Sequence, residues 1–264
     1  MEYQELGVSG VQIPDIGLGT WKYIGGSEPF QRAVELGAGF IDTAEGYNNE
    51  EEVGTALKGI RDKVFLATKV SPGHFHEKDL LKAADQSLKR LNVDVLDLYQ
   101  LHWPNDDIPI AETMGAMESL VNVGKVRFIG VSNFSIKQMK AAQDALSKAR
   151  IVANQVRYSL KDRSIEDSLL AYCQEEGMTI IAYSPLATGL GQLASKDGTD
   201  TIGQVAAKLG KTHAQVALNW CLRQQRVMVI PKANSSEHVE DDCGASGWRL
   251  SYDDLAIIDE AFPR

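Results

Sequence analysis

Cysteines are few in this chain, and long apolar runs are absent. The three cysteines, Cys173, Cys221 and Cys243, are odd in number and lack the spacing of a metal site. They indicate reduced thiols of the kind common in the cytosol. The apolar stretches fall far short of the ~20 residues of a membrane span, and the first ten residues lack the basic start and apolar core of a signal peptide. We therefore expect a cytoplasmic protein that does not bind membranes.

Basic residues are scarcer than acidic ones. The chain of 264 residues has 27 Lys and Arg against 36 Asp and Glu, which gives a formal net charge of −9, and its pI is about 5.1. Binding to nucleic acid or to an anionic membrane calls for a basic face, so this balance argues against both. With 44% hydrophobic and 24% charged residues, the composition is that of an ordinary globular protein. Any anionic ligand must be held by a few local cations.

Apolar runs rich in β-forming residues alternate with helical patterns along the chain. The eight runs cover residues 16–20, 40–42, 64–69, 95–101, 126–132, 151–156, 179–183 and 227–230. Helical patterns cover residues 30–36, 51–57, 77–90, 110–123, 136–146, 165–176, 202–209, 212–224, 236–243 and 252–262. Segments 3–6 and 11–13 suggest a short hairpin before the first run. No linker interrupts the pattern, which predicts one α/β domain over residues 1–264, a (β/α)8 TIM barrel with an N-terminal hairpin and one extra C-terminal helix.

An open doubly wound sheet is the alternative fold. Gly17 and Gly19, followed by Asp42, imitate a dinucleotide-binding fingerprint with its ribose-binding acid. However, Lys22 stands where the third glycine is needed, and Trp21 would block a close approach of phosphate. The barrel is the preferred prediction.

Polar residues of chemical interest stand at or just beyond the ends of the predicted strands. In a barrel these carboxyl ends meet on one rim, which is where the chemistry of such folds takes place. A single charge at a strand end has a trivial explanation, but a whole rim of reactive side chains predicts an active site. The residues are Trp21, Asp42, Tyr47, Lys69, His102, Trp103, Ser132, Asn133, Gln155, Tyr183, Ser184 and Lys232.

Four of these side chains can together protonate a carbonyl group. A tyrosine such as Tyr47 is a poor acid at neutral pH until a cation lowers its pKa of ~10. Lys69 can supply that cation, and Asp42 can keep the lysine charged and aimed. His102 can donate a hydrogen bond to the carbonyl oxygen. Neither a nucleophile with a base partner nor a cluster of metal ligands is evident, so the electrons must come from a bound hydride donor.

At these residues the chain resembles the aldo-keto reductase family over nearly its full length. The segments IGLGTW, FIDTAEGY, ATKV, LYQLHWP, IGVSNF, ANQVRYS, IAYSPL and VIPKA are similar to that family's strand-end motifs, in the same order. The resemblance implies an NAD(P)H-dependent reductase of aldehydes and ketones. It also implies a catalytic tetrad of Asp42, Tyr47, Lys69 and His102, with Tyr47 as the proton donor.

The resemblance further implies where cofactor and substrate bind. The nicotinamide would stack on Tyr183, its carboxamide would be held by Ser132, Asn133 and Gln155, and Lys232 would hold the 2′-phosphate of NADPH. Trp21 and Trp103, with Tyr47 and His102, would line the substrate pocket. The full set implied for the cofactor is Gly19, Thr20, Trp21, Asp42, Ser132, Asn133, Gln155, Tyr183, Ser184, Pro185, Leu186, Ile230, Lys232, Ala233, His238, Asp241 and Asp242.

The chain departs from the family pattern mainly on the phosphate side. Asn48 follows the catalytic tyrosine where glycine is common, although asparagine also tolerates turn geometry. His238 stands in place of a frequent arginine, and Asp241-Asp242 in place of a frequent Glu-Asn. We therefore expect NADPH to be preferred, with a weakened grip, and NADH to be a weaker alternative. Larger members of the family carry a long loop after the last barrel helix, whereas this chain has only Trp248 to Arg264 there, which predicts an open, permissive pocket.

Other functions are weighed against this one. His74-Phe75-His76 has the spacing of metal-dependent barrel hydrolases, but it follows Pro72-Gly73 in a loop, and no metal site is predicted. A cofactor-binding regulatory subunit with little turnover is the alternative within the same family. The segment with Gly189, Gly191 and Gly198 lacks the lysine of a phosphate-binding loop, and we expect it to cover the cofactor. A small-molecule carbonyl substrate and a monomeric chain complete the prediction.

Overall fold

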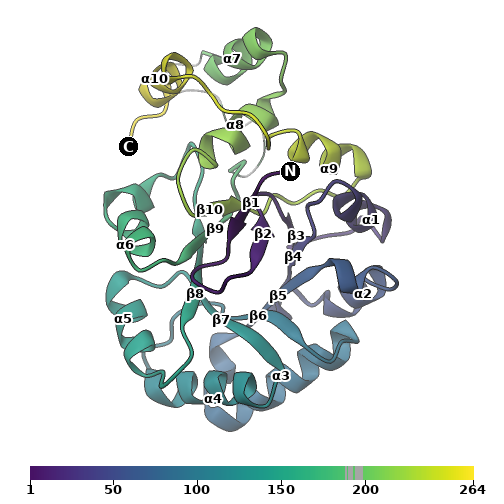
Figure 1. Ribbon diagram of the computed structural model, residues 1–264, viewed down its shortest axis with the longest axis vertical. Coiled ribbons are helices and arrows are strands. Elements are labelled where there is room, and N and C mark those ends of the chain that lie inside the picture. The colour runs from purple at the N-terminus through teal and green to yellow at the C-terminus, as the bar shows by residue number, and fades with distance from the viewer. Residues whose placement is uncertain (188, 190–192, 194–198) are drawn as a thin grey trace.

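Eight parallel strands curl into a barrel, with helices outside it (Figure 1). The computed structural model describes residues 1–187, 189, 193 and 199–264. The strands follow one another in chain order around the sheet, and the first and last meet through the Gly17 N–Val229 O and Gly19 N–Pro231 O hydrogen bonds, both 2.9 Å long. This closure confirms the (β/α)8 barrel and excludes the open sheet. The strands are β3 (Leu18–Gly19), β4 (Phe40–Asp42), β5 (Phe65–Val70), β6 (Leu96–Leu101), β7 (Val126–Ser132), β8 (Ile151–Arg157), β9 (Thr179–Tyr183) and β10 (Val227–Val229).

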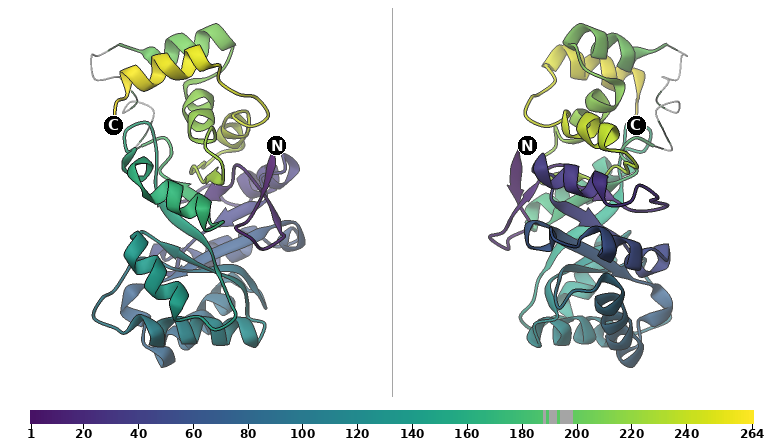
Figure 2. Two further views of the ribbon diagram at one scale, coloured as in Figure 1. Left: turned by 60° about the vertical axis from the view of Figure 1, so that its left-hand side comes forward. Right: turned by 90° about the vertical axis from the view of Figure 1, so that its right-hand side faces the viewer.

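The helices that follow the strands lie close to their predicted positions. They are α1 (Glu28–Glu35), α2 (Glu50–Ala56), α3 (Glu77–Leu91), α4 (Ile110–Asn122), α5 (Ile136–Asp144), α6 (Leu169–Glu175), α8 (His213–Cys221) and α9 (Ser236–Cys243). Two further helices, α7 (Thr201–Leu209) and α10 (Tyr252–Ala261), pack on each other beyond this ring (Figure 2). Short 3₁₀ turns are η1 (Glu45–Tyr47), η2 (Arg61–Lys63), η3 (Pro72–His74) and η4 (Ser164–Asp167).

Local sequence sets where several helices begin and end. Ser135 with Gln138, and Thr212 with Gln215, form capping boxes that start α5 and α8. The predicted helix over residues 165–176 is wrong in its first turn, because Ser168 has an extended φ of −160° that separates η4 from α6.

The predicted N-terminal hairpin closes the amino end of the barrel. Its strands β1 (Tyr3–Glu5) and β2 (Gln12–Pro14) pair antiparallel and lie across the barrel in Figure 1. Leu6 and Ile13 are fully buried against barrel residues such as Phe40 and Met228. With this end filled by apolar side chains, the carboxyl end is the one left for a site.

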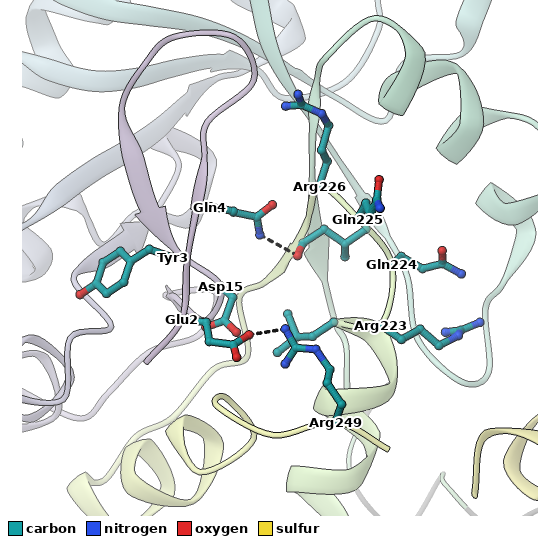
Figure 3. Close-up of a pocket in the computed structure, with 11 residues that line it drawn as sticks. Glu2, Tyr3, Gln4, Asp15, Arg223, Gln224, Gln225, Arg226 and Arg249 are labelled. Carbon is teal, nitrogen blue, oxygen red and sulfur yellow. Dashed lines mark hydrogen bonds and ion pairs between the residues drawn. The ribbon is translucent and has the colours of Figure 1, made fainter. Parts of the chain in front are cut away.

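A cavity of about 270 Å³ also lies at the amino end, between the hairpin and the turn before β10 (Figure 3). Gln4 Nε2 donates to Val227 O over 2.8 Å, and Glu2 pairs with Arg249 across it. In this fold the amino face contributes to stability, whereas catalysis takes place at the opposite face. These contacts tie the first strand to the C-terminal segment, and we assign no chemistry to the cavity.

Two further features bear on the predictions. No helix within the described residues is long and apolar enough to cross a membrane. Of the glycine segment expected to cover the cofactor, Gly191 and Gly198 lie outside the described residues.

Candidate active site

A buried lysine connects the ends of two strands and the turn that carries Tyr47 at the carboxyl rim of the barrel. Lys69, near the end of β5, is fully buried, and its Nζ lies 2.5 Å from Asp42 Oδ1 at the end of β4. The same ammonium group donates to Thr43 O over 2.9 Å and contacts the Tyr47 hydroxyl at 3.3 Å. Three polar contacts around one buried charge satisfy its hydrogen-bonding capacity. The sequence predicted the three side chains, but not the role of the Thr43 carbonyl.

The tyrosine is presented by a turn that the chain holds at both ends. Tyr47 closes η1, and Asn48 follows it with a left-handed φ of +55°, the geometry expected where the family often has glycine. At the other end of the turn, Glu45 Oε1 accepts a hydrogen bond from Ser71 N over 2.9 Å and lies 2.8 Å from His74 Nδ1. These contacts hold the turn beside the end of β5. The Tyr47 phenol therefore lies close to Lys69.

His74 and His76 do not share a site. His74 contacts Glu45, whereas His76 Nδ1 lies 3.1 Å from Glu112 on α4. Within the described residues no group of three or more potential ligands is gathered for a metal ion. His74 instead connects its loop to the turn that carries Tyr47, and His76 connects its loop to α4.

The protonation states of the cluster suit proton donation by the phenol. Burial lowers the pKa of Lys69, but Asp42 and Tyr47 raise it by more, so the pKa lies above its ordinary value. Burial raises the pKa of Tyr47, and the Lys69 charge offsets this effect only in part. The expected lowering of the Tyr47 pKa by the cation is therefore outweighed by desolvation in the chain alone. The phenol holds its proton at neutral pH and can donate it.

His102 completes the cluster as an uncharged ring. Its ring centroid lies 5.5 Å from that of Tyr47, in an edge-to-face arrangement. Burial and the charge of Lys69 lower the pKa of His102 to about 4. The imidazole is therefore neutral at pH 7, as the sequence argument requires of a group that donates a hydrogen bond without carrying an extra proton.

A second polar cluster adjoins the first across β7, β8 and β9. The Tyr183 hydroxyl donates to Asn133 Oδ1 over 3.1 Å, and the Asn133 amide donates to Ser132 Oγ over 3.0 Å. Ser132 Oγ donates to the backbone oxygen of Gln155 over 2.9 Å. Asn133 has a left-handed φ of +63°, which turns the chain sharply at the end of β7. Four residues predicted to hold the nicotinamide are thus side by side.

Gln155 connects the two clusters, together with a glutamine that the sequence analysis did not single out. Gln155 Nε2 donates to Asp42 Oδ2 over 2.8 Å, and Gln100 Nε2 donates to the same oxygen over 3.2 Å. Gln100 lies on β6 in register with Lys69 and is fully buried. Its position two residues before His102 was the available signal, since alternate residues of a strand face the same side.

The residues predicted around the adenosine end lie in the loop after β10 and on α9, and among the described residues no hydrogen bond joins them to the Lys69 cluster. Lys232 is exposed, and His238 is exposed in the first turn of α9. The Asp241 carboxylate accepts from Thr212 Oγ1 over 2.8 Å and from Gln215 Nε2 over 3.0 Å. Burial, with the nearby Asp241, raises the pKa of Asp242 to about 8. Asp242 is therefore largely uncharged at neutral pH, whereas the expected weakening of the grip on NADPH counted both acids as carboxylates.

The remaining predicted residues surround the rim. The Thr20 hydroxyl is buried and has no hydrogen-bond partner among the described residues. Gly19 packs so closely that an added Cβ would lie 2.8 Å from Ile230 O, which gives this glycine a structural role. Ser184 has a φ of +50° just after β9. Trp21 is 57% exposed and Trp103 is 49% exposed, whereas Pro185, Ile230 and Ala233 are buried and Leu186 is half-buried.

Fold and site together define an enzyme class. A barrel presents, at its carboxyl rim, a phenol beside a buried lysine–carboxylate pair, a neutral imidazole, and an adjoining set of hydroxyl and amide groups. Such an arrangement can polarise and protonate a carbonyl group beside a bound hydride donor.

The comparisons with known proteins agree with this class. The model of the aldo/keto reductase family matches residues 15–262. Methylglyoxal reductase YeaE of Escherichia coli is 39% identical over 96% of this chain and 92% of its own length. Glyoxal reductase of Bacillus subtilis is 36% identical over 95% of this chain and 90% of its own. The chain belongs to the aldo/keto reductase family.

Solved structures resemble the whole fold. The thermostable aldo-keto reductase Tm1743, in complex with the inhibitor epalrestat, superposes with a TM-score of 0.90 at 39% identity and covers 99% of this chain and 100% of its own. An aldo/keto reductase of Klebsiella pneumoniae, in complex with NADP and acetate, gives 0.86 at 40% identity and covers 96% and 92%. These relatives support carbonyl reduction and give no support to a regulatory subunit with little turnover.

Proposed function

We propose that this chain reduces small aldehydes and ketones to alcohols with NADPH, and that Tyr47 is the proton donor. The observation that carries the proposal is the position of Lys69, which is fully buried and contacts both Asp42 Oδ1 and the Tyr47 hydroxyl. A buried charge of this kind is costly unless it is paired, and perturbed groups cluster at functional sites.

Each member of the cluster has a distinct task. The nicotinamide, when bound, supplies the hydride. Tyr47 gives its proton to the carbonyl oxygen, and Lys69 stabilises the phenolate that remains. Asp42 keeps the lysine charged and aimed at the phenol. His102, neutral at pH 7, donates a hydrogen bond that orients the carbonyl oxygen.

The residues of the second cluster fit the cofactor. A carboxamide offers one acceptor and two donors, and Ser132, Asn133 and Gln155 provide hydroxyl and amide groups within one hydrogen-bonded set. The Thr20 hydroxyl is buried without a partner among the described residues, which favours a polar ligand at the end of β3. Complexes of two Klebsiella pneumoniae aldo-keto reductases with NADP and NADPH support the same choice of cofactor.

Lys232 is the residue we propose to read the 2′-phosphate. It is exposed and forms no hydrogen bond or ion pair with any residue that the structure describes. The chain has a net charge of −9, so a local cation is needed to hold this group. NADH would bind without that contact and more weakly.

Small carbonyl compounds, including dicarbonyls, are the proposed substrate class. Trp21 and Trp103 are about half exposed at the rim, where they provide apolar walls without enclosing the site. The names of the relatives, a methylglyoxal reductase and a glyoxal reductase, favour short substrates. A single-domain, monomeric, cytoplasmic protein remains our prediction from the sequence.

An assay with both cofactors tests the proposal. The purified chain should oxidise NADPH, followed by absorbance, in the presence of methylglyoxal, glyoxal or an aromatic aldehyde, and should use NADH less well. Modest selectivity among these aldehydes is expected from the open rim. No oxidation of either cofactor with any member of an aldehyde and ketone panel would refute the function.

A further inference from the structure

The two oxygens of the Asp42 carboxylate have different hydrogen-bond partners. Its Oδ1 faces Lys69, while its Oδ2 accepts hydrogen bonds from Gln155 over 2.8 Å and from Gln100 over 3.2 Å. The side chain is almost fully buried, so these two amides are the donors on which Oδ2 depends. A buried carboxylate oxygen without donors loses substantial free energy.

One of the two amides has a competing task. Under the proposed function Gln155 belongs to the set that binds the carboxamide of NADPH. Its amide group would then interact with the cofactor as well as with Asp42. Gln100 has no such second task, because among the described residues the only hydrogen-bond partner of its Oε1 is the Gln155 amide, at 3.5 Å. Of the two donors to Asp42 Oδ2, Gln100 is therefore the one that takes no part in the proposed binding of the cofactor.

The barrel is built to hold Gln100 in this place. Gln100 is paired in register with Lys69 on one side and with Gly130 of β7 on the other. A Cβ at Gly130 would lie 3.0 Å from the Gln100 Cγ, closer than side chains normally approach. The missing side chain of Gly130 therefore provides the space that the Gln100 side chain fills.

We propose that Gln100 is a positioning residue that holds the Asp42 carboxylate against Lys69 while Gln155 engages the cofactor. This inference rests on the proposed function. Without Gln100, Asp42 Oδ2 would keep only the Gln155 donor, which also serves the cofactor, and the lysine would be less well aimed at Tyr47. The binding of NADPH would change little, because Gln100 is not in the proposed cofactor set.

The first test compares two substitutions of similar size. Gln100→Met keeps the packing against Gly130 but removes the donor, and kcat should fall about tenfold, since a hydrogen bond to a charged group contributes ~1.5–3 kcal/mol. The KM of the aldehyde, and the Kd of NADPH from fluorescence titration, should change less than twofold. Gln100→Glu can donate only when protonated, so its kcat should recover as pH falls, whereas that of Gln100→Met should not.

A second measurement needs no activity. In the cofactor-free chain, Gln155 still serves Asp42, so Gln100→Met alone should lower the urea unfolding midpoint only slightly. The double variant Gln100→Met/Gln155→Met leaves Oδ2 without either donor, and its midpoint should fall by more than the sum of the single changes. Gln174→Met, which removes an amide that bonds Gln225 O far from the site, is the matched control.

The outcomes separate the two proposals. If the native chain reduces no carbonyl compound, the proposed function fails, and the unfolding cycle still reports whether the two amides share Asp42. If the native chain is active but Gln100→Met retains kcat within twofold from pH 6 to 8, Gln100 has no positioning role. Additive unfolding midpoints in the double variant would also overturn the inference.

Discussion

The ammonium group of Lys69 lies 2.5 Å from the Asp42 carboxylate, and neither side chain is exposed by more than 2%. Burying two charges carries a desolvation penalty that their mutual attraction does not reliably repay. Hydrophobic residues of similar size would stabilise a barrel core at least as well. We therefore propose that the pair serves mainly chemistry, because it places a positive charge beside the Tyr47 hydroxyl.

Replacing Tyr47 by phenylalanine should abolish most of the reductase activity. The phenol is the group proposed to donate the proton, and general acid catalysis typically contributes ~10²–10⁴-fold. Fold and NADPH binding should be retained, as judged by thermal unfolding and fluorescence titration. Tyr252→Phe, at a tyrosine that is 92% exposed, should behave like the native chain. Retention of more than about a tenth of the native kcat in Tyr47→Phe would remove this residue from the proton-donor role.

Replacing Lys69 by methionine should impair both activity and stability. Activity should fall across the whole pH range, because the cation that stabilises the phenolate is lost. Stability should fall by ~3–5 kcal/mol, the usual cost of leaving one member of a buried pair unpaired.

The double variant Lys69→Met/Asp42→Asn separates these two effects. It removes the unpaired charge, so urea unfolding should show much of the lost stability restored. Its kcat should stay as low as that of Lys69→Met. A pH–rate profile of Lys69→Met that matches the native profile would exclude the lysine from the mechanism.

The barrel, and the grouping of the four residues that we propose to be catalytic, could be predicted from the sequence because their signals are local. Runs of β-forming residues separated by helical periods predict the eight strands, and the residue that ends each strand lies on one rim whatever the details of packing. Strand ends are less well determined, since hydrogen bonding decides them. β3 covers only Leu18–Gly19 although the apolar run extends over residues 16–20, and β8 extends one residue beyond its predicted end, to Arg157.

Contacts that depend on the twist and register of the barrel could not be predicted in the same way. Gln100 on β6 reaches Asp42 on β4 across the one intervening strand, and this contact depends on how β4, β5 and β6 are staggered. From the sequence, Asp242 was expected only to be a charged neighbour of the phosphate site. It lies three residues after Val239, on the buried face of α9, and the low polarity around it changes its protonation.

The burial of Asp242 predicts a pH-dependent stability. Its folded pKa of about 8 lies above the ordinary value of 3.8. The stability associated with this group is therefore fully present below about pH 4 and is lost as pH rises through 8. Since one pKa unit corresponds to ~1.4 kcal/mol, the loss amounts to several kcal/mol at most. Asp242→Asn removes the titration, and its melting temperature should exceed that of the native chain by roughly 5 °C at pH 9.

The comparison between pH values is the decisive part of this experiment. At pH 5 the native carboxyl group is protonated, and the two proteins should melt within a degree or two of each other. Asp253→Asn, at an exposed acid in the first turn of α10, should show no growing difference between pH 5 and pH 9. A constant difference between Asp242→Asn and the native chain over that range would mean that Asp242 does not titrate there.

The last prediction concerns the choice between NADPH and NADH. Lys232 follows β10 at the carboxyl rim and is exposed, and hydrogen bonds to charged groups contribute ~1.5–3 kcal/mol, or roughly 10–150-fold in affinity. Lys232→Ala should therefore weaken NADPH by about this factor and leave NADH nearly unchanged. His238, in the first turn of α9, stands where the family often has arginine, so His238→Arg should strengthen NADPH alone.

Fluorescence titration of each variant with each cofactor distinguishes a phosphate contact from a general effect of charge. Lys58→Ala removes one positive charge from another exposed position on the same chain. Because surface charges more than about 10 Å apart are largely screened at 0.1 M salt, this control should change neither affinity. Raising the salt concentration should weaken NADPH more than NADH in the native chain and should affect both equally in Lys232→Ala. An equal loss of affinity for both cofactors in Lys232→Ala would show that this lysine does not bind the 2′-phosphate.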